Sequence, residues 1–317
     1  MYTYEPEERE LAIEQESKKY KIAVVPKQHN IPYFRAVEKG AIDAAEELEM
    51  ELIYQGPALA DSDLQISTIQ EIMDQNVDLI AVSAIDPNKL APVLKEAQNK
   101  GIEVITWDSD VLSSSRSFFI NMVNPETLGR HLMDMMALTM DDHGDFAIIT
   151  GSASAANINE WLKWIKIQHE EYYPNMNLVE VVPTDDNPAK AYEIAIDLMK
   201  EYPDLKGVIG NSSVGPPAAA QAVMDLGKKG EVSVVGLSSP SEMKGYLNNG
   251  AAQVSTLWSP EKLGYLTVSL SKQLLEGEYP NDLQDVPNVG RIQVKGDTVI
   301  MGEPIDFTKE NVDQYDF

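Results

Sequence analysis

The amino-acid sequence predicts an α/β protein of two doubly wound parallel-sheet lobes. With 317 residues, the chain is too long for one ordinary hydrophobic core and suits two domains. From Lys21 onward, short β-branched runs alternate with segments of helical periodicity, and the alternation restarts in the second half. The strand-like runs are almost continuously apolar, as expected when helices cover both faces of a parallel sheet.

The first half shows five strand-like runs and three helical segments. The third helix ends at Gly101, a residue type that commonly stops helices. Strands are expected at Ile22–Pro26, Glu51–Gly56, Leu79–Ser83, Val104–Asp108 and Ser117–Asn121, with helices at Tyr33–Leu48, Ser62–Gln75 and Leu90–Lys100.

The second half repeats this order after a helix at Pro125–Met140. No Gly-, Ser- or Pro-rich segment separates the halves, so we expect a structured junction rather than a loose linker. A last helix at Pro260–Glu276 precedes a hairpin, Arg291–Val294 and Thr298–Gly302. The other strands are expected at Phe146–Gly151, Leu178–Pro183, Gly207–Asn211, Val232–Leu237 and Ala252–Trp258, with helices at Asn157–Tyr173, Pro188–Glu201, Pro216–Lys228 and Pro240–Asn248.

The composition excludes several classes of protein. Acidic residues outnumber basic ones 51 to 25, and the resulting formal charge of -26 repels nucleic acid and anionic lipid. The absence of cysteine excludes disulfides, zinc-thiolate sites and a thiol nucleophile. The four histidines lack metal-ligand spacing, and no GxSxG, P-loop or GxGxxG motif occurs. We therefore expect no enzyme, no metal and no cofactor.

The N-terminal segment carries no visible targeting signal. Met1–Glu16 is acidic and polar without an apolar core, and no stretch reaches the roughly 20 apolar residues of a membrane span. Residues 1–20 are interpreted as a flexible tether. The chain is then either cytoplasmic or an extracytoplasmic protein whose signal region precedes the sequence.

Polar and aromatic side chains follow the predicted strands. Ligands of open parallel sheets bind beyond the carboxyl ends of the strands, so these positions should meet in one site. Carboxylates, amides and hydroxyls suit the hydroxyl groups of a neutral polyol, and aromatic faces suit its C–H faces. The expected ligand-binding residues are Lys27, Tyr33, Phe34, Asp108, Asp110, Asn157, Asn159, Asn211, Ser213, Ser238 and Trp258.

Each of these residues also has a structural interpretation. Asp108 and Asp110 could cap the next segment, and Lys27 could be a solvated surface lysine. Asn157 is an ordinary helix N-cap candidate. Trp161, on the following helix, is interpreted as packing rather than a ligand contact. Clustering at one expected sheet edge is what favours a binding site over these separate interpretations.

Four segments carry a family resemblance: Val25–Lys27 (VPK), Thr106–Asp110 (TWDSD), Pro217–Ala222 (PAAAQA) and the tail Phe307–Phe317. With them, the chain from about residue 21 resembles the ribose-type periplasmic sugar-binding proteins of bacterial ABC importers. Within that family it is similar to the autoinducer-2-binding and rhamnose-binding branches.

Two of the six ligand-contacting positions of the autoinducer-2 receptors are retained, at Lys27 and Asp108. Segments around Asn30–Phe34, Ile149–Trp161 and Leu257–Leu266 are similar to the rhamnose branch, which favours a rhamnose-like deoxyhexose over autoinducer-2. The four positions that depart from the autoinducer-2 pattern are Asn157, Ile158, Asn211 and Ser213.

The resemblance implies two lobes joined by a hinge, with three crossings of the chain. The first lobe would comprise residues 21–124 and 259–290, and the second residues 125–258 and 291–317. It also implies a monomer outside the cytoplasm that closes on a small neutral sugar or autoinducer-2 and docks on an ABC permease. A receptor that signals to a membrane kinase, or the sensing core of a transcriptional regulator, is the alternative.

Overall fold

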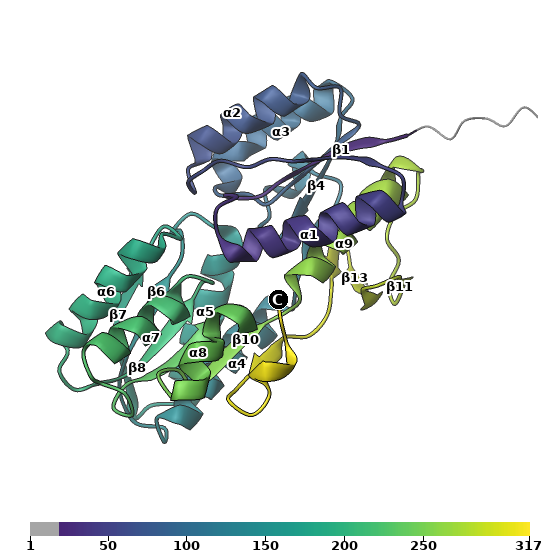
Figure 1. Cartoon of the computed structure of the whole chain (residues 1–317). Coiled ribbons are helices and arrows are strands. Elements are labelled where there is room, and N and C mark those ends of the chain that lie inside the picture. The colour runs from purple at the N-terminus through teal and green to yellow at the C-terminus, as the bar shows by residue number, and fades with distance from the viewer. Residues whose placement is uncertain (1–18) are drawn as a thin grey trace, which may run out of the picture.

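The computed structural model describes residues 19–317, so all but two residues of the predicted tether lie outside the described part of the chain. The described residues form two lobes, each a mainly parallel sheet with helices on both faces (Figure 1). The predicted fold class is confirmed. Two short strands, β11 (Asp285–Val286) and β12 (Gly290–Arg291), form a separate hairpin that the sequence pattern did not predict.

The first lobe is built on a seven-stranded sheet. Its strands are β1 (Lys21–Val25), β2 (Glu51–Tyr54), β3 (Leu79–Val82), β4 (Glu103–Trp107), β5 (Phe119–Asn121), β13 (Gln293–Lys295) and β14 (Thr298–Ile300). They lie in the order β13-β14-β5-β4-β3-β1-β2. A short 3-10 turn, η1 (Ser113–Ser115), lies between β4 and β5.

Alternate side chains of the first sheet serve two helical layers. Helices α1 (Pro32–Glu47) and α9 (Pro260–Leu275) cover one face, where Ile22 and Val24 of β1 are buried. Helices α2 (Ser62–Met73) and α3 (Pro87–Asn99) cover the other, where Ala23 and Val25 are buried. Both faces of β1 are therefore in apolar contact, which explains its unbroken apolar run.

The second lobe is built on a six-stranded sheet. Its strands are β6 (Gly144–Thr150), β7 (Met176–Pro183), β8 (Leu205–Asn211), β9 (Ser233–Leu237), β10 (Val254–Leu257) and β15 (Ile305–Phe307). Their order is β15-β10-β9-β8-β6-β7. The helices are α4 (Pro125–Thr139), α5 (Ala156–Tyr172), α6 (Pro188–Glu201), α7 (Gly215–Asp225) and α8 (Pro240–Asn249), and η2 (Val312–Gln314) is a terminal 3-10 turn.

The C-terminal hairpin corrects one prediction. We assigned residues 291–317 to the second lobe, but β14 pairs in parallel with β5 of the first sheet, from Thr298 opposite Phe119 to Ile300 opposite Asn121. Without β14, the backbone groups of β5 would form an open sheet edge. Only β15, which pairs antiparallel with β10, returns the chain to the second lobe.

Helix α9 lies directly against α1, although more than 200 residues separate them in sequence (Figure 1). Glycines allow this approach: a Cβ atom on Gly264 would lie 2.0 Å from the backbone oxygen of Val37, and one on Gly40 would lie 1.8 Å from that of Glu261. The chain therefore passes between the lobes after β5, after β10 and after β14.

Candidate binding site between the lobes

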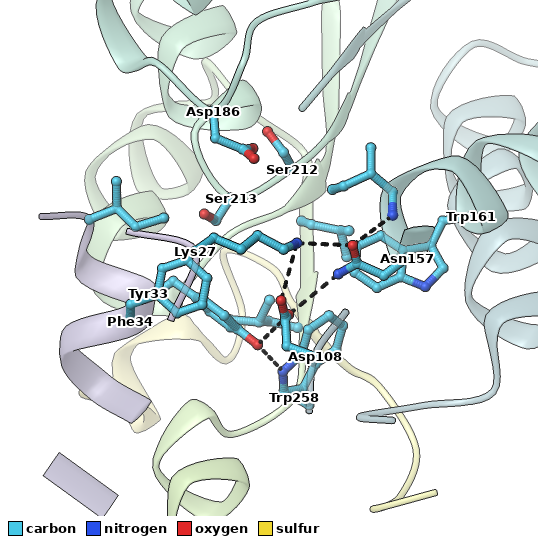
Figure 2. A pocket seen from close by; sticks show the side chains of 14 residues that line it. Lys27, Tyr33, Phe34, Asp108, Asn157, Trp161, Asp186, Ser212, Ser213 and Trp258 are labelled. Carbon is cyan, nitrogen blue, oxygen red and sulfur yellow. Dashed lines mark hydrogen bonds and ion pairs between the residues drawn. The ribbon is translucent and has the colours of Figure 1, made fainter. Parts of the chain in front are cut away.

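A cavity of about 40 Å³ lies where the carboxyl ends of the two sheets face each other (Figure 2). The first lobe contributes residues that follow β1 and β4. The second lobe contributes residues that follow β7 and β8, together with residues at the start of α5. Its lining residues are Lys27, Ile31, Tyr33, Phe34, Asp108, Asn157, Ile158, Trp161, Asp186, Ser212, Ser213, Leu237, Leu257 and Trp258.

Asp108 is the centre of the first-lobe wall. Its Oδ2 accepts from Ser83 Oγ at 2.6 Å and forms an ion pair with Lys27 Nζ at 3.2 Å. Its Oδ1 accepts from Tyr33 OH at 3.2 Å. Asp108 and Lys27 are only 3 % and 4 % exposed, so the pair is shielded from water and its geometry is well defined.

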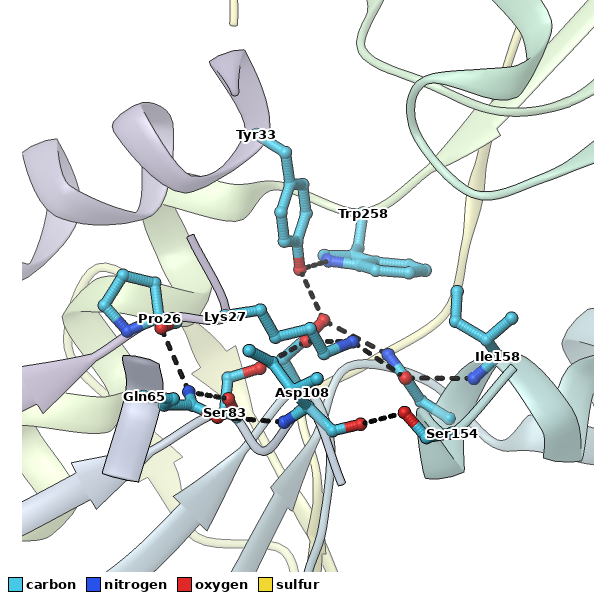
Figure 3. A network of polar contacts seen from close by, with 11 residues as sticks. Pro26, Lys27, Tyr33, Gln65, Ser83, Asp108, Ser154, Ile158 and Trp258 are labelled. Carbon is cyan, nitrogen blue, oxygen red and sulfur yellow. Dashed lines mark hydrogen bonds and ion pairs between the residues drawn. The ribbon is translucent and has the colours of Figure 1, made fainter. Parts of the chain in front are cut away.

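Gln65 of α2 holds the strand ends that carry this wall (Figure 3). Its side-chain Nε2 donates to the backbone oxygens of Pro26 at 3.1 Å and Ser83 at 2.8 Å. Its Oε1 accepts from the backbone N–H of Ile85 at 3.0 Å. One fully buried amide therefore fixes the ends of β1 and β3, on which Lys27 and the Ser83 hydroxyl depend.

Asn157 connects the two walls (Figure 2). Its Oδ1 accepts from Lys27 Nζ across the cleft at 3.0 Å, and also from the N–H of Ile158 at 2.9 Å. Its Nδ2 lies 3.4 Å from Asp108 Oδ1, at the long limit for a hydrogen bond. A single amide in the first turn of α5 thus meets both charged groups of the first lobe.

Four aromatic rings, those of Tyr33, Phe34, Trp161 and Trp258, lie around the polar groups of the cavity (Figure 2). Trp258 lies edge-on to Tyr33 with centroids 6.2 Å apart, and its Nε1 donates to Tyr33 OH at 3.1 Å. Trp161 of the second lobe lies 5.7 Å from Trp258, and Phe34 lies 5.0 Å from Tyr33. These rings offer apolar faces beside the polar cluster, as a sugar ring requires.

Burial sets the protonation of two lining groups. It raises the pKa of Tyr33 well above its ordinary value, and the nearby Asp108 carboxylate raises it further, so Tyr33 remains a hydrogen-bond donor. Burial also raises the pKa of Asp186, a shift that the Lys27 ammonium partly opposes and the Asp108 charge adds to.

The structure brings seven of the eleven predicted residues to the cavity. They come from both lobes and include two of the three charged residues expected there, Lys27 and Asp108. The seven are Lys27, Tyr33, Phe34, Asp108, Asn157, Ser213 and Trp258.

Two predicted residues lie away from the cavity because other groups bind them. Asp110 accepts from Arg116 Nε at 2.9 Å and Nη2 at 2.7 Å, and Arg116 also pairs with Asp297 at the hairpin turn. The side chain of Asn159 is exposed and donates to the backbone oxygen of Ala153 at 2.9 Å. Both were predicted as ligand contacts and instead stabilise their own lobes.

The other two predicted residues, Asn211 and Ser238, lie behind the residues that line the cavity. Asn211 is fully buried and donates to Thr150 Oγ1 at 3.2 Å and to the backbone oxygen of Ile158 at 3.0 Å, which connects β8 to β6 and α5. Ser238 donates to the backbone oxygen of Ser213 at 2.9 Å. These contacts support residues that line the cavity without lining it themselves.

Sequence reasoning missed several lining residues, and for some of them a signal existed. Asp186 follows β7, a strand end that the strand-end rule covers. Trp161 lies one helical turn beyond Asn157, so the two share a face of α5. Ile158 falls on a ligand-contacting position of the autoinducer-2 receptors, whereas the apolar lining residues Ile31, Leu237 and Leu257 carry no sequence signal that separates them from core.

A family model for the periplasmic binding protein domain matches residues 22–279. The chain belongs to this family. The predicted resemblance is thereby confirmed, and so is the prediction of a non-enzyme, because periplasmic binding proteins bind a solute without converting it. In the described part of the chain, no helix combines the length and apolar character needed to span a membrane.

Relatives within the family support the fold at high coverage. An ABC transporter solute-binding protein from Clostridium phytofermentas, with bound L-rhamnose, is 28% identical with a TM-score of 0.89, covering 94% of this chain and 98% of that one. LsrB from Clostridium saccharobutylicum, in complex with AI-2, has a TM-score of 0.88 at 24% identity over 94% and 100% of the two chains, a likeness of fold alone. The D-ribose/D-allose-binding protein of Pseudomonas aeruginosa is 24% identical over 84% of this chain and 86% of its own length.

Proposed function

We propose that this periplasmic binding protein captures a small neutral sugar for an ABC importer, with a rhamnose-type deoxyhexose favoured and autoinducer-2 second. The observation that carries the proposal is the cavity itself. Lys27 and Asp108 of one lobe lie within hydrogen-bond distance of Asn157 of the other, and Tyr33 donates to Asp108 beside aromatic faces. This combination suits vicinal hydroxyls on a ring with an apolar face.

Binding proceeds by hinge closure in this proposal. The polar lining groups are almost fully buried, so a ligand enters only when the lobes part. Side-chain hydrogen bonds cross the cleft from Lys27 to Asn157 and from Asn157 to Asp108. Others run from Gln28 to the backbone oxygen of Asp186 and from Ser154 to the backbone oxygen of Ile85. A ligand that contacts both walls stabilises the closed form, because only differential contact shifts such an equilibrium.

The ranking of ligands follows the relatives. Of these two, the rhamnose-bound protein has the higher identity, 28% against 24%, and the likeness to the AI-2-bound one is of fold alone. The retained Lys27 and Asp108 keep autoinducer-2 as the second candidate. In this proposal the protein acts as a monomer outside the cytoplasm and delivers its ligand to a membrane permease.

A thermal-shift screen followed by calorimetry tests the proposal. L-rhamnose, autoinducer-2, D-ribose and D-arabinose are the probes. A ligand at 100 times its dissociation constant adds about 2.7 kcal/mol to the free energy of unfolding, which gives a clear melting shift. We expect the largest shift with L-rhamnose; a larger shift with autoinducer-2 reverses the ranking, and no shift with any probe contradicts sugar binding.

Two asparagines in the first turn of α5 supply a matched control. Asn157→Ala removes the amide that meets Lys27, so we expect at least tenfold weaker binding, or about 1.4 kcal/mol. Asn159→Ala changes an exposed side chain outside the cavity and should leave the affinity unchanged. If the two variants bind the sugar with equal affinity, the cavity is not the binding site.

A further inference from the structure

Asp186 is a second carboxylate in the cavity wall, on the opposite lobe from Asp108. It lies in the connection between β7 and α6, and only 9 % of the residue is exposed. Figure 2 shows its carboxyl group near Ser212, with the Lys27 side chain lying between it and Asp108. The Lys27 ammonium and hydrogen bonds from Ser152 and Ser212 lower the pKa of Asp186 and so partly offset the effect of burial on its charge.

The backbone around Asp186 is shaped to hold the carboxyl group in place. Gly151 leaves room for it, because a Cβ atom there would stand 2.4 Å from Asp186 Oδ1. Asp185 and Asp186 both adopt left-handed conformations, with φ of 55° and 53°. Non-glycine residues adopt this conformation at a cost of order 1 kcal/mol or more each, so two in succession mark a position that the surrounding structure enforces.

Asp186 also makes the net charge of the cavity lining negative. Among the lining residues, Lys27 is the one cation, whereas Asp108 and Asp186 are both carboxylates. Asp108 already accepts from Ser83, Tyr33 and Lys27. With both carboxylates ionised the lining carries one net negative charge, in a shielded place where like charges repel strongly.

We infer that Asp186 is a specificity-determining residue that accepts a hydroxyl of a neutral sugar and repels the anionic counterpart of that sugar. The inference rests on the proposed function and refines its ligand class. The isosteric change Asp186→Asn removes the charge and keeps the shape. It should therefore weaken binding of the neutral sugar and allow the anion to bind. If Asp186 were merely structural, its replacement would weaken the binding of both ligands alike.

The test compares L-rhamnose with L-rhamnose 1-phosphate by calorimetry at pH 8. For the wild-type chain we expect the phosphate to bind at least 100-fold more weakly. In Asp186→Asn, L-rhamnose should bind about tenfold more weakly, and the preference for it should fall at least tenfold. The matched control is Asp185→Asn, which removes the adjacent exposed charge, paired with Lys190, and should preserve both affinities.

A second variant separates position from charge. Gly151→Ala pushes on Asp186 Oδ1 but keeps the carboxylate, so rhamnose affinity should fall while rejection of the phosphate persists. Wild-type selectivity in Asp186→Asn, the same loss of selectivity in Asp185→Asn, or no phosphate binding to Asp186→Asn overturns the inference. If no sugar binds the wild-type chain, the proposed function fails and this inference fails with it; if rhamnose binds normally, only the inference is at stake.

Discussion

The two walls of the cavity differ in how completely their polar groups are already paired. On the first lobe, both oxygens of Asp108 accept hydrogen bonds, and Gln65 fixes the strand ends beneath it. On the second lobe, the buried Trp161 Nε1 has no hydrogen-bond partner among the described residues. The first wall is therefore preorganised, and the second retains hydrogen-bonding capacity that a ligand can use.

This difference predicts that damage to the first wall costs more than damage to the second. A variant in the first wall disrupts a network of paired groups, whereas one in the second removes a single contact with the ligand. Three changes test this ordering, and a fourth concerns an ion pair away from the cavity.

The largest effect is expected at Asp108. Its φ of 60° is left-handed, a conformation that asparagine also tolerates, so Asp108→Asn changes charge without adding backbone strain. It leaves the buried Lys27 ammonium without its ion-pair partner, and breaking a buried pair typically costs about 3–5 kcal/mol. We expect sugar affinity to fall more than 100-fold by calorimetry. Retention of binding within tenfold contradicts the importance of the first wall.

The second-largest effect is expected for the packing of α1 against α9, the helix pair that carries this wall. Tyr33 lies at the start of α1, and Trp258 lies two residues before α9. Gly264→Ala forces a Cβ to within 2.0 Å of the Val37 backbone oxygen, so we expect a loss of about 1–3 kcal/mol in the free energy of unfolding by urea denaturation, with weaker sugar binding.

Gly245 of α8 supplies the control for this helix pair. It belongs to the second lobe, and a Cβ atom added there would meet no neighbouring atom within 4 Å. Gly245→Ala should raise stability by about 0.5–1 kcal/mol through helix propensity. Equal effects at Gly264 and Gly245 would show that the close approach of α1 and α9 is unimportant.

A smaller effect is expected at Trp161. Trp161→Phe keeps a ring beside Trp258 and removes the unpaired Nε1–H donor, so sugar affinity should fall about fivefold to tenfold, or roughly 1 kcal/mol. Calorimetry measures it. Trp164→Phe is the control, because its Nε1 donates to Glu160 outside the cavity and its loss should leave binding unchanged. An unchanged affinity in Trp161→Phe would show that the second wall has no spare donor for the ligand.

The smallest effect concerns stability away from the cavity. His131 Nε2 lies 2.8 Å from Asp306 Oδ1, and this hydrogen bond raises the pKa of His131. Burial alone would raise the pKa of Asp306, but hydrogen bonds with His131 and Thr256 lower it overall. Between the ordinary pKa values of the two groups, about 4 and about 6.5, both are charged and the pair contributes fully.

The contribution of this pair is lost as pH rises through the raised pKa of His131, and again as pH falls through the lowered pKa of Asp306. His131→Asn should therefore reduce the melting temperature most near pH 5–6 and least above pH 8. The side chains are 27% and 35% exposed, so the loss should stay below about 1 kcal/mol. A penalty that is independent of pH contradicts the ion pair.

Adjacent residues show how far sequence reasoning reached in the candidate site. The strand-end rule placed both Asp108 and Asp110 near the cleft, but Arg116 binds Asp110 and only Asp108 lines the cavity. Likewise, the first turn of α5 presents Asn157 to the cavity and leaves Asn159 exposed. Local pattern locates the edge of a sheet, whereas distant partners decide which side chain at that edge is available.

The sequence alone determined the alternation of strands and helices, because unbroken apolar runs and helical periodicity are local consequences of burial on both faces of a sheet. It also determined that Lys27 and Asp108 follow strands of one lobe. Only the tertiary structure decided that the C-terminal hairpin completes the first sheet and that α9 packs against α1. Those outcomes depend on pairing and approach between segments far apart in the chain, which no local pattern encodes.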